Sequence, residues 1–179
     1  MKATLFSTIF IGVFFSASAQ LVITNNETPE QLVLNSFVGE NLTISNIKYN
    51  GTTGSALNVS DQVARFSNGT AGLSCEQGLI LCTGKAIVAA GPNNNASASI
   101  TTAMPMTGDS DLSMLAGTGS PVQNICKVEF DFIPNGNTVL FEYIFASEEY
   151  PTYVGSVAND SFGLFLSGPG ISGPYSNGA

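Results

Sequence analysis

Beyond residue 19, the chain lacks the apolar periodicity that a helical fold needs. No stretch of about 11 residues keeps the spacing of an amphipathic helix, whereas short alternating runs recur between Gly, Asn and Pro. This pattern predicts an all-β fold, mostly antiparallel and β-sandwich or jelly-roll-like, with at most one or two short helices. One helix is expected over residues 29–38, because Thr28 can cap it and Pro29 suits its first turn. Strands are expected over residues 42–49, 63–67, 78–82, 126–133, 138–146 and 160–167, with a long loop over residues 90–120.

The strongest local signal is a β-hairpin over residues 127–145. Asn135-Gly136 separates two alternating runs, and this dipeptide is the preferred sequence of the tight type I′ turn. A two-residue turn would create one wholly apolar face, which is expected to line the core. The expected pairs on this face are Phe132 with Val139, Phe130 with Phe141 and Val128 with Tyr143.

The other face of the same hairpin would place Glu129 opposite Glu142. Directly opposed carboxylates repel each other, so they need solvent, a neighbouring cationic side chain or a bound cation. Solvation or a contact with Lys127 is the simpler explanation.

Composition excludes several chemistries. The chain has no His, so Ser-His-Asp, Cys-His and HExxH sites are impossible. Its 13 acidic and 5 basic residues include no basic cluster, so no nucleic-acid partner is expected. The Gly-Pro-Gly run at residues 168–170 is not followed by Lys and Ser or Thr, so it is no nucleotide-binding loop.

The N-terminus has the order of a secretory signal peptide. Met1-Lys2 precedes an apolar run over residues 5–15 and then Ala17-Ser18-Ala19, which predicts cleavage after Ala19. The apolar run is too short for a transmembrane helix, which needs about 20 residues, and no later segment is expected to span a membrane. Residues 20–179 are expected to form one secreted domain. The good strand pattern at 160–167 lies close to the C-terminus, so the domain is expected to be incomplete there, with any anchoring region beyond it.

Three cysteines, Cys75, Cys82 and Cys126, allow at most one internal disulfide. An extended strand would separate Cys75 and Cys82 by more than about 20 Å, which is too far for a disulfide. A bridge would therefore include Cys126. Three buried thiols that act as small apolar side chains are the alternative.

Two acidic groups are candidate calcium ligands, because calcium binds about six to eight oxygen atoms. The alternative is a solvated acidic rim in which Asn159-Asp160 makes a turn. Calcium is the only cofactor that the sequence suggests. The candidate ligands are Glu148, Glu149, Asn159 and Asp160 around one loop, and Asp109 with Asp111.

The same carboxylates could serve as the acid and base of a glycosidase. No Trp is present to form a sugar platform, so catalysis is not expected. Tyr150, Tyr153 and Tyr175, with Asn93 in an Asn-rich loop, could instead form a rim that binds carbohydrate or a partner surface. Tyrosines in plain surface turns are the alternative.

Several motifs in order resemble the choice-of-anchor L domain of secreted bacterial surface proteins. They are LVLNSFVG at 32–39, GLILCTG at 78–84, GPN at 91–93, Asp111-Leu112, VEFDF at 128–132, FASEEYP at 145–151, NDSFG at 159–163 and FLSGPG at 165–170. The resemblance covers nearly all of residues 20–179 and implies a β-rich extracellular module, joined in longer relatives to diverse surface anchors. It implies no activity, and the chain departs from it at Cys75 and Cys82, where small polar residues are expected.

The sequence thus favours a non-catalytic extracellular adhesion or ligand-binding module. Carbohydrate or a surface protein is the expected partner. The alternative is a calcium-dependent carbohydrate-active enzyme domain that uses paired carboxylates.

Overall fold

The computed structural model describes residues 20–39, 42–53, 61–95, 98–102, 106–117, 121–156 and 160–179. The predicted signal peptide at residues 1–19 and the candidate ligand Asn159 lie outside the described residues.

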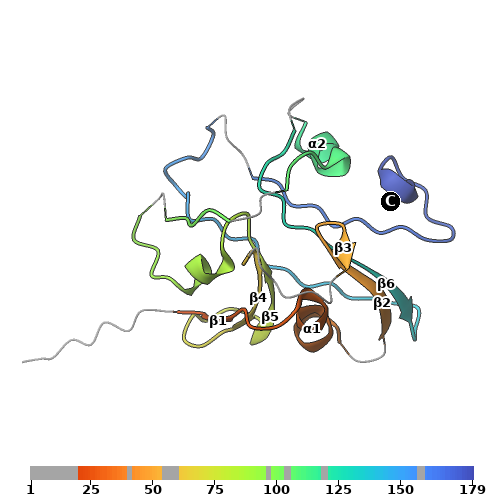
Figure 1. The fold of residues 1–179 in the computed structure, drawn as a ribbon, viewed down its shortest axis with the longest axis horizontal. Helices are drawn as coiled ribbons and strands as arrows, with labels where there is room; N and C mark the ends of the chain where they lie inside the picture. Colours follow the sequence, from red (N-terminus) through yellow and green to blue (C-terminus); the bar gives the residue numbers. More distant parts are fainter. Residues whose placement is uncertain are drawn as a thin grey trace, which may run out of the picture.

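The described strands form two antiparallel sheets of three strands each, so the predicted all-β class is confirmed (Figure 1). One sheet has the order β1-β4-β5, with β1 at Val22–Thr24, β4 at Val63–Ser67 and β5 at Gln77–Leu81. The other has the order β3-β2-β6, with β3 at Thr52–Thr53, β2 at Leu42–Tyr49 and β6 at Val128–Pro134. The predicted strands at 42–49 and 63–67 agree with the structure, and those at 78–82 and 126–133 agree apart from small shifts at their ends.

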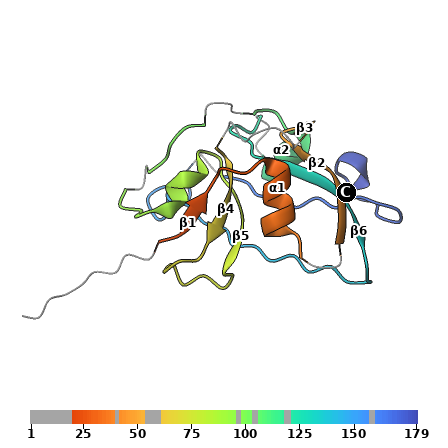
Figure 2. The same ribbon diagram turned by 60° about the horizontal axis from the view of Figure 1, so that its bottom comes forward.

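A short helical segment stands between the two sheets. The α-helix α1 (Pro29–Leu32) continues into the π-helical turn η1 (Val33–Phe37), which confirms the predicted helix over residues 29–38. Thr28 caps it reciprocally with Gln31: the Thr28 hydroxyl accepts from the Gln31 amide at 3.1 Å, and the Thr28 amide donates to Gln31 Oε1 at 2.9 Å. The segment contacts β4 and β5 on one side and β2 on the other, as Figure 2 shows. Leu32 and Val33 are fully buried there, so the helix supplies part of the shared core.

A buried amide joins the same two sheets through hydrogen bonds. Gln62, which immediately precedes β4, is 0% exposed. Its Oε1 accepts from the hydroxyl of Tyr49 in β2 at 2.7 Å, and its Nε2 donates to the carbonyls of Thr83 and Asn124, each at 3.2 Å. A buried polar group is stable only when it is paired, so this side chain fixes the position of three separate segments.

The predicted hairpin at residues 127–145 is wrong. β6 pairs with β2, with Phe132 opposite Ile44, and residues 138–146 are not a strand. A type I′ turn needs positive φ at both central residues, and neither Asn135 nor Gly136 has it. Figures 1 and 2 show the chain after β6 crossing back toward β4 and β5. The local preference of the turn sequence is therefore overridden by tertiary packing.

The aromatic side chains of the expected hairpin still meet, but through a third ring. Phe37 of η1 makes edge contacts with Phe130, at 5.7 Å between ring centroids, and with Phe141, at 5.8 Å. Further along, Tyr143 stacks on Phe162 at 5.3 Å. Aromatic side chains can gain this packing without a hydrogen-bonded ladder between their segments. The expected core face is confirmed for the β6 side, where Phe130 is half-buried, and is wrong for Val139, Phe141 and Tyr143, which are exposed.

Two further expectations about the strands are corrected. Residues 160–167 form no strand, because none of the described strands pairs with them. Glu129 lies opposite Lys48 of β2 rather than Glu142, and Lys127 Nζ approaches its carboxylate at 3.7 Å, so the expected repulsion does not arise.

The predicted loop over residues 90–120 contains the helix α2 (Ser110–Ala116), which was too short to show helical periodicity. Two 3-10 turns, η2 (Ala86–Ala90) and η3 (Ser176–Gly178), complete the described helices. Within the described part of the chain, no helix has the length and apolar character needed to cross a membrane.

We expect Phe130→Ala to lower the free energy of unfolding by about 2 to 4 kcal/mol, because it removes the ring that packs on Phe37. Ile133→Ala is the matched control on the opposite face of β6, where Ile133 is 70% exposed, and should change stability by less than about 0.5 kcal/mol. Urea denaturation of both variants measures the difference. Equal effects would contradict the inward orientation of Phe130.

We expect Gln62→Ala to destabilise the chain by about 3 kcal/mol or more, because it leaves the Tyr49 hydroxyl and the carbonyls of Thr83 and Asn124 without this partner. Gln123→Ala, at an exposed glutamine, should cost less than about 0.5 kcal/mol. Thermal unfolding compares the two. A small loss in Gln62→Ala would show that the buried amide does not hold the sheets together.

Candidate functional site

A pocket of about 280 Å³ lies along residues 145–156, which form the pocket loop. It brings together four of the residues predicted from sequence, namely Glu149, Tyr150, Tyr153 and Asp160. Tyr150 is 74% exposed and Tyr153 is 43% exposed, so their rings are accessible from solvent. Four further residues complete the lining: Phe145, Ser147, Val154 and Gly155.

The loop around this pocket is held by its own turns. The Glu149 amide donates to Ser147 Oγ at 3.1 Å, and the Tyr153 amide donates to the Glu149 carbonyl at 3.1 Å. The Ser156 amide in turn donates to the Tyr153 carbonyl at 3.0 Å. Short-range hydrogen bonds of this kind fold the segment locally, which sets both tyrosines and Glu149 on one side of the loop.

Asn93 and Glu148 lie beside the pocket without lining it. Asn93 Nδ2 donates to the main-chain carbonyl of Glu148 at 3.5 Å, so the predicted Asn-rich loop does reach the acidic loop. Glu148 is half-buried whereas Glu149 is exposed. The two neighbouring carboxylates therefore have different environments, and only that of Glu149 lines the pocket.

Cys82, which follows the last residue of β5, is affected by the charges of Glu148 and Asp160. Burial raises the pKa of the Cys82 thiol above its ordinary value of 9.0. The negative charges of Glu148 and Asp160 raise this pKa further, whereas hydrogen bonds from the main-chain amides of Gly84 and Thr83 lower it in part. Cys82 thus lies close enough to both carboxylates to sense their charge. Sequence reasoning treated this cysteine only as a candidate disulfide or core residue, because nothing local linked it to residues 148 and 160.

Asp109 and Asp111 belong to a different part of the molecule. Asp109 is the N-cap of α2, where its Oδ1 accepts from the amides of Asp111 and Leu112 at 3.0 Å each, and its Oδ2 pairs with Lys127 Nζ at 3.1 Å. Asp111 Oδ1 accepts from the amide and hydroxyl of Ser176 at 3.1 and 2.9 Å. Neither carboxylate lines the pocket.

The sequence contained a signal for the role of Asp109. Aspartate before a short helix and glycine after it are a common pair of helix boundaries, and Gly117 does adopt the left-handed conformation at φ 63°.

Tyr175 also lies apart from the pocket, because its ring packs edge-on against Phe165 at 4.9 Å.

The calcium hypothesis stays a prediction. Of its six candidate ligands, Glu149 and Asp160 share the pocket, Glu148 lies beside it, Asp109 and Asp111 are elsewhere, and Asn159 is outside the described residues. In the part of the chain that the structure describes, His, Cys, Asp and Glu side chains do not gather in groups of three or more that could hold a metal ion.

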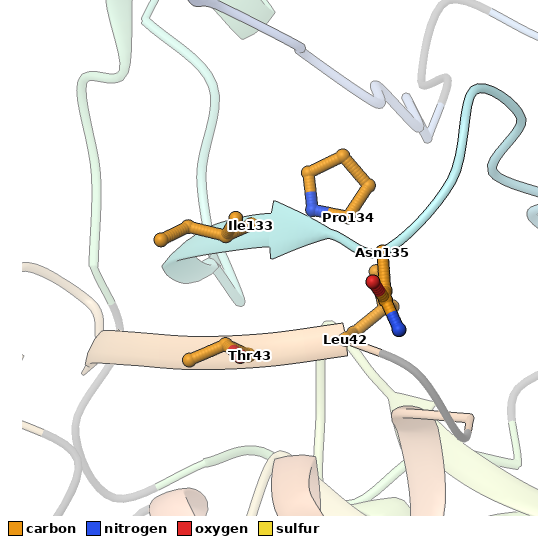
Figure 3. A pocket seen from close by; sticks show the side chains of 5 residues that line it. All are labelled: Leu42, Thr43, Ile133, Pro134 and Asn135. Atoms are coloured by element: carbon orange, nitrogen blue, oxygen red, sulfur yellow. The ribbon is translucent and has the colours of Figure 1, made fainter.

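A second hollow, of about 340 Å³, lies at the far end of the β2-β6 pair (Figure 3). Its side chains come from the first two residues of β2, the last two of β6 and the residue that follows. It contains no charged residue and none of the candidate site residues predicted from the sequence. The lining is Leu42, Thr43, Ile133, Pro134 and Asn135.

We expect the stability contributed by Asp109 to depend on pH. Burial raises the pKa of this carboxyl group, but the hydrogen bonds from Leu112, Lys127 and Asp111 outweigh it, so the pKa lies below the ordinary value of 3.8. A lowered pKa stabilises the folded chain above about pH 4, and this contribution is lost as the pH falls through the lowered value.

Asp109→Ala should therefore cost about 1 to 2 kcal/mol at pH 7 and progressively less below about pH 4. Asp109→Asn keeps a capping oxygen and should cost about 0.5 kcal/mol at pH 7 through loss of the ion pair with Lys127. Urea denaturation at several pH values measures both. A loss in Asp109→Ala that does not change with pH would rule out the ionised cap.

A comparison with curated proteins and another with solved structures give no match. A comparison with family models matches the choice-of-anchor L domain over residues 21–179. The match includes both sheets, the helical segment between them and the pocket loop, and it confirms the resemblance drawn from the sequence motifs. The family is one of surface-associated bacterial modules, secreted or held at the cell surface, and the chain belongs to the choice-of-anchor L domain family.

Proposed function

We propose that this chain is a non-catalytic extracellular module that binds carbohydrate through the pocket lined by side chains of residues 145–155 and by Asp160. The single observation that carries the proposal is that Tyr150 and Tyr153 meet Glu149 and Asp160 around one hollow. Secretion by means of residues 1–19 is part of the proposal and agrees with the surface-associated family.

The chemistry of the lining suits a sugar. A pyranose ring has apolar C–H faces and polar edges, and a tyrosine offers an apolar ring with a polar tip. Carboxylates accept hydrogen bonds from sugar hydroxyl groups, so Glu149 and Asp160 can orient a ring that rests on a tyrosine. A hollow of about 280 Å³ is of a size for one or two sugar units rather than for a long buried chain.

The position of the site also favours binding at a surface. Tyr150, at 74% exposed, and Val154, at 69% exposed, stand at its edge, where a glycan on another surface could reach them. Adhesion needs an accessible edge of this kind, because the ligand remains attached to something larger.

The alternative is a calcium-dependent carbohydrate-active enzyme. One observation favours it: the carboxylates of Glu149 and Asp160 line the same pocket, and a pair of carboxylates across a sugar is the arrangement of a glycosidase. The two functions predict different fates for the sugar, since only an enzyme releases a shorter product.

We expect Tyr150→Ala to weaken glycan binding by the full chain about tenfold or more, because a tyrosine that stacks on a ligand contributes about 1.4 kcal/mol or more. Calorimetric titration with a panel of oligosaccharides, with calcium chloride and then with EDTA, measures the affinity, and chromatography of the sugars afterwards detects products. Leu140→Ala is the control, since Leu140 is 89% exposed and outside the pocket.

Carboxylate variants separate the two functions. Glu149→Gln should weaken binding, while Glu142→Gln, at an exposed carboxylate outside the pocket, should leave it unchanged. Hydrolysis that is lost in Glu149→Gln would replace the proposal with the enzymatic alternative. Binding that survives Tyr150→Ala and Tyr153→Ala unchanged, or no binding to any sugar of the panel, would contradict the pocket as a carbohydrate site.

A further inference from the structure

We propose that Cys82 and Cys126 form a disulfide in the oxidised chain, whereas Cys75 remains a thiol. All three cysteines are free thiols in this structure, so the cross-link concerns the oxidised form of the protein. A secreted domain meets conditions in which disulfides form and persist.

A single main-chain oxygen brings the two cysteines together. The carbonyl of Gln62 accepts from the Cys82 amide at 2.9 Å, which continues the β4-β5 ladder by one residue, and it also accepts from Cys126 Sγ at 3.7 Å. The Cys126 thiol therefore lies directly beside the main chain from which the Cys82 side chain starts. A disulfide requires Cα atoms within about 7 Å, and we infer from the two contacts to this one oxygen that Cys82 and Cys126 come within that range.

The Gln62 side chain fixes the same two segments. Its Nε2 donates at 3.2 Å both to Thr83, the residue after Cys82, and to Asn124, two residues before Cys126. The carbonyls of Thr83 and Asn124 thus accept hydrogen bonds from the same nitrogen atom, so they lie close to each other. Two segments far apart in sequence are held side by side at the position of the two thiols.

Cys75 is excluded by the length of β5. It precedes Gln77, the first residue of this strand, whereas Cys82 follows Leu81, the last. An extended strand of this length spans about 15 Å or more, so Cys75 lies at the opposite end of β5 from Cys82. Since Cys126 lies beside Cys82, Cys126 is also near the end of β5 that lies away from Cys75.

The reaction is a thiol-disulfide exchange. The two thiols lose two protons and two electrons as the Cys82–Cys126 bond forms, and the disulfide of the oxidant, oxidised glutathione or an oxidised dithiol protein, breaks into two thiols. Burial raises the pKa of Cys126 to about 12 and that of Cys82 above 9.0. Because the thiolate is the reactive form, exchange is slow in the folded chain, so the bond forms during folding or during long exposure to the oxidant.

The test is a map of the cysteines in the full chain. The protein is refolded with oxidised glutathione, remaining thiols are blocked with iodoacetamide, and the unreduced protein is digested and analysed by mass spectrometry. Trypsin leaves Cys75 and Cys82 on one peptide between Arg65 and Lys85, so a second cleavage after Glu76 separates them. We expect a peptide with Cys82 linked to one with Cys126, and a blocked Cys75.

A second measurement follows stability. Reduction with dithiothreitol should lower the Tm of the oxidised chain by about 10 °C, because the cross-link closes a long loop. Cys75→Ser should keep both the linked peptide and this Tm difference, while Cys82→Ser should lose both. A link that includes Cys75, glutathione on Cys82 beside an unlinked Cys126, or three blocked thiols after refolding with the oxidant would overturn the proposal.

Discussion

The structure depends on one buried amide. Gln62 is fully enclosed, yet its side chain is paired with Tyr49 of β2 and with the carbonyls of Thr83 and Asn124. Each of these bonds would be worth little at the surface, where water competes for the same groups. In the interior the unpaired alternative costs much more, so the network admits only one arrangement of the two sheets.

Apolar packing completes the same connection. Leu32 and Val33 of the helical segment are fully buried between strands of both sheets, and Val63 and Ala64 of β4 are buried beside them. Such packing is strong but has little directional preference, since apolar contacts tolerate sliding. The amide supplies the directional restraint that apolar burial lacks.

The hairpin shows where sequence reasoning failed and why. Asn135-Gly136 has the right residues for a tight turn, but the preference of a turn amounts to little beside the packing of several aromatic rings. β6 already has a ladder partner in β2, and Phe37 offers Phe141 an aromatic contact that needs no strand. The capping role of Asp109 also needed the structure, because an aspartate that caps a helix and one that binds a cation have the same residue type in a sequence.

The sequence by itself determined the fold class, the helix that Thr28 caps, four of the strands and the family, because these depend on periodicity, capping residues and motif order within short windows. It also placed Glu149, Tyr150, Tyr153 and Asp160 among the candidate site residues. Only the tertiary structure decided which of them share a pocket, which strand pairs with β6, and which cysteine lies beside Cys126. The physical reason is that such contacts join segments far apart in the chain, and they are selected by the burial and hydrogen bonding of the whole core rather than by local preference.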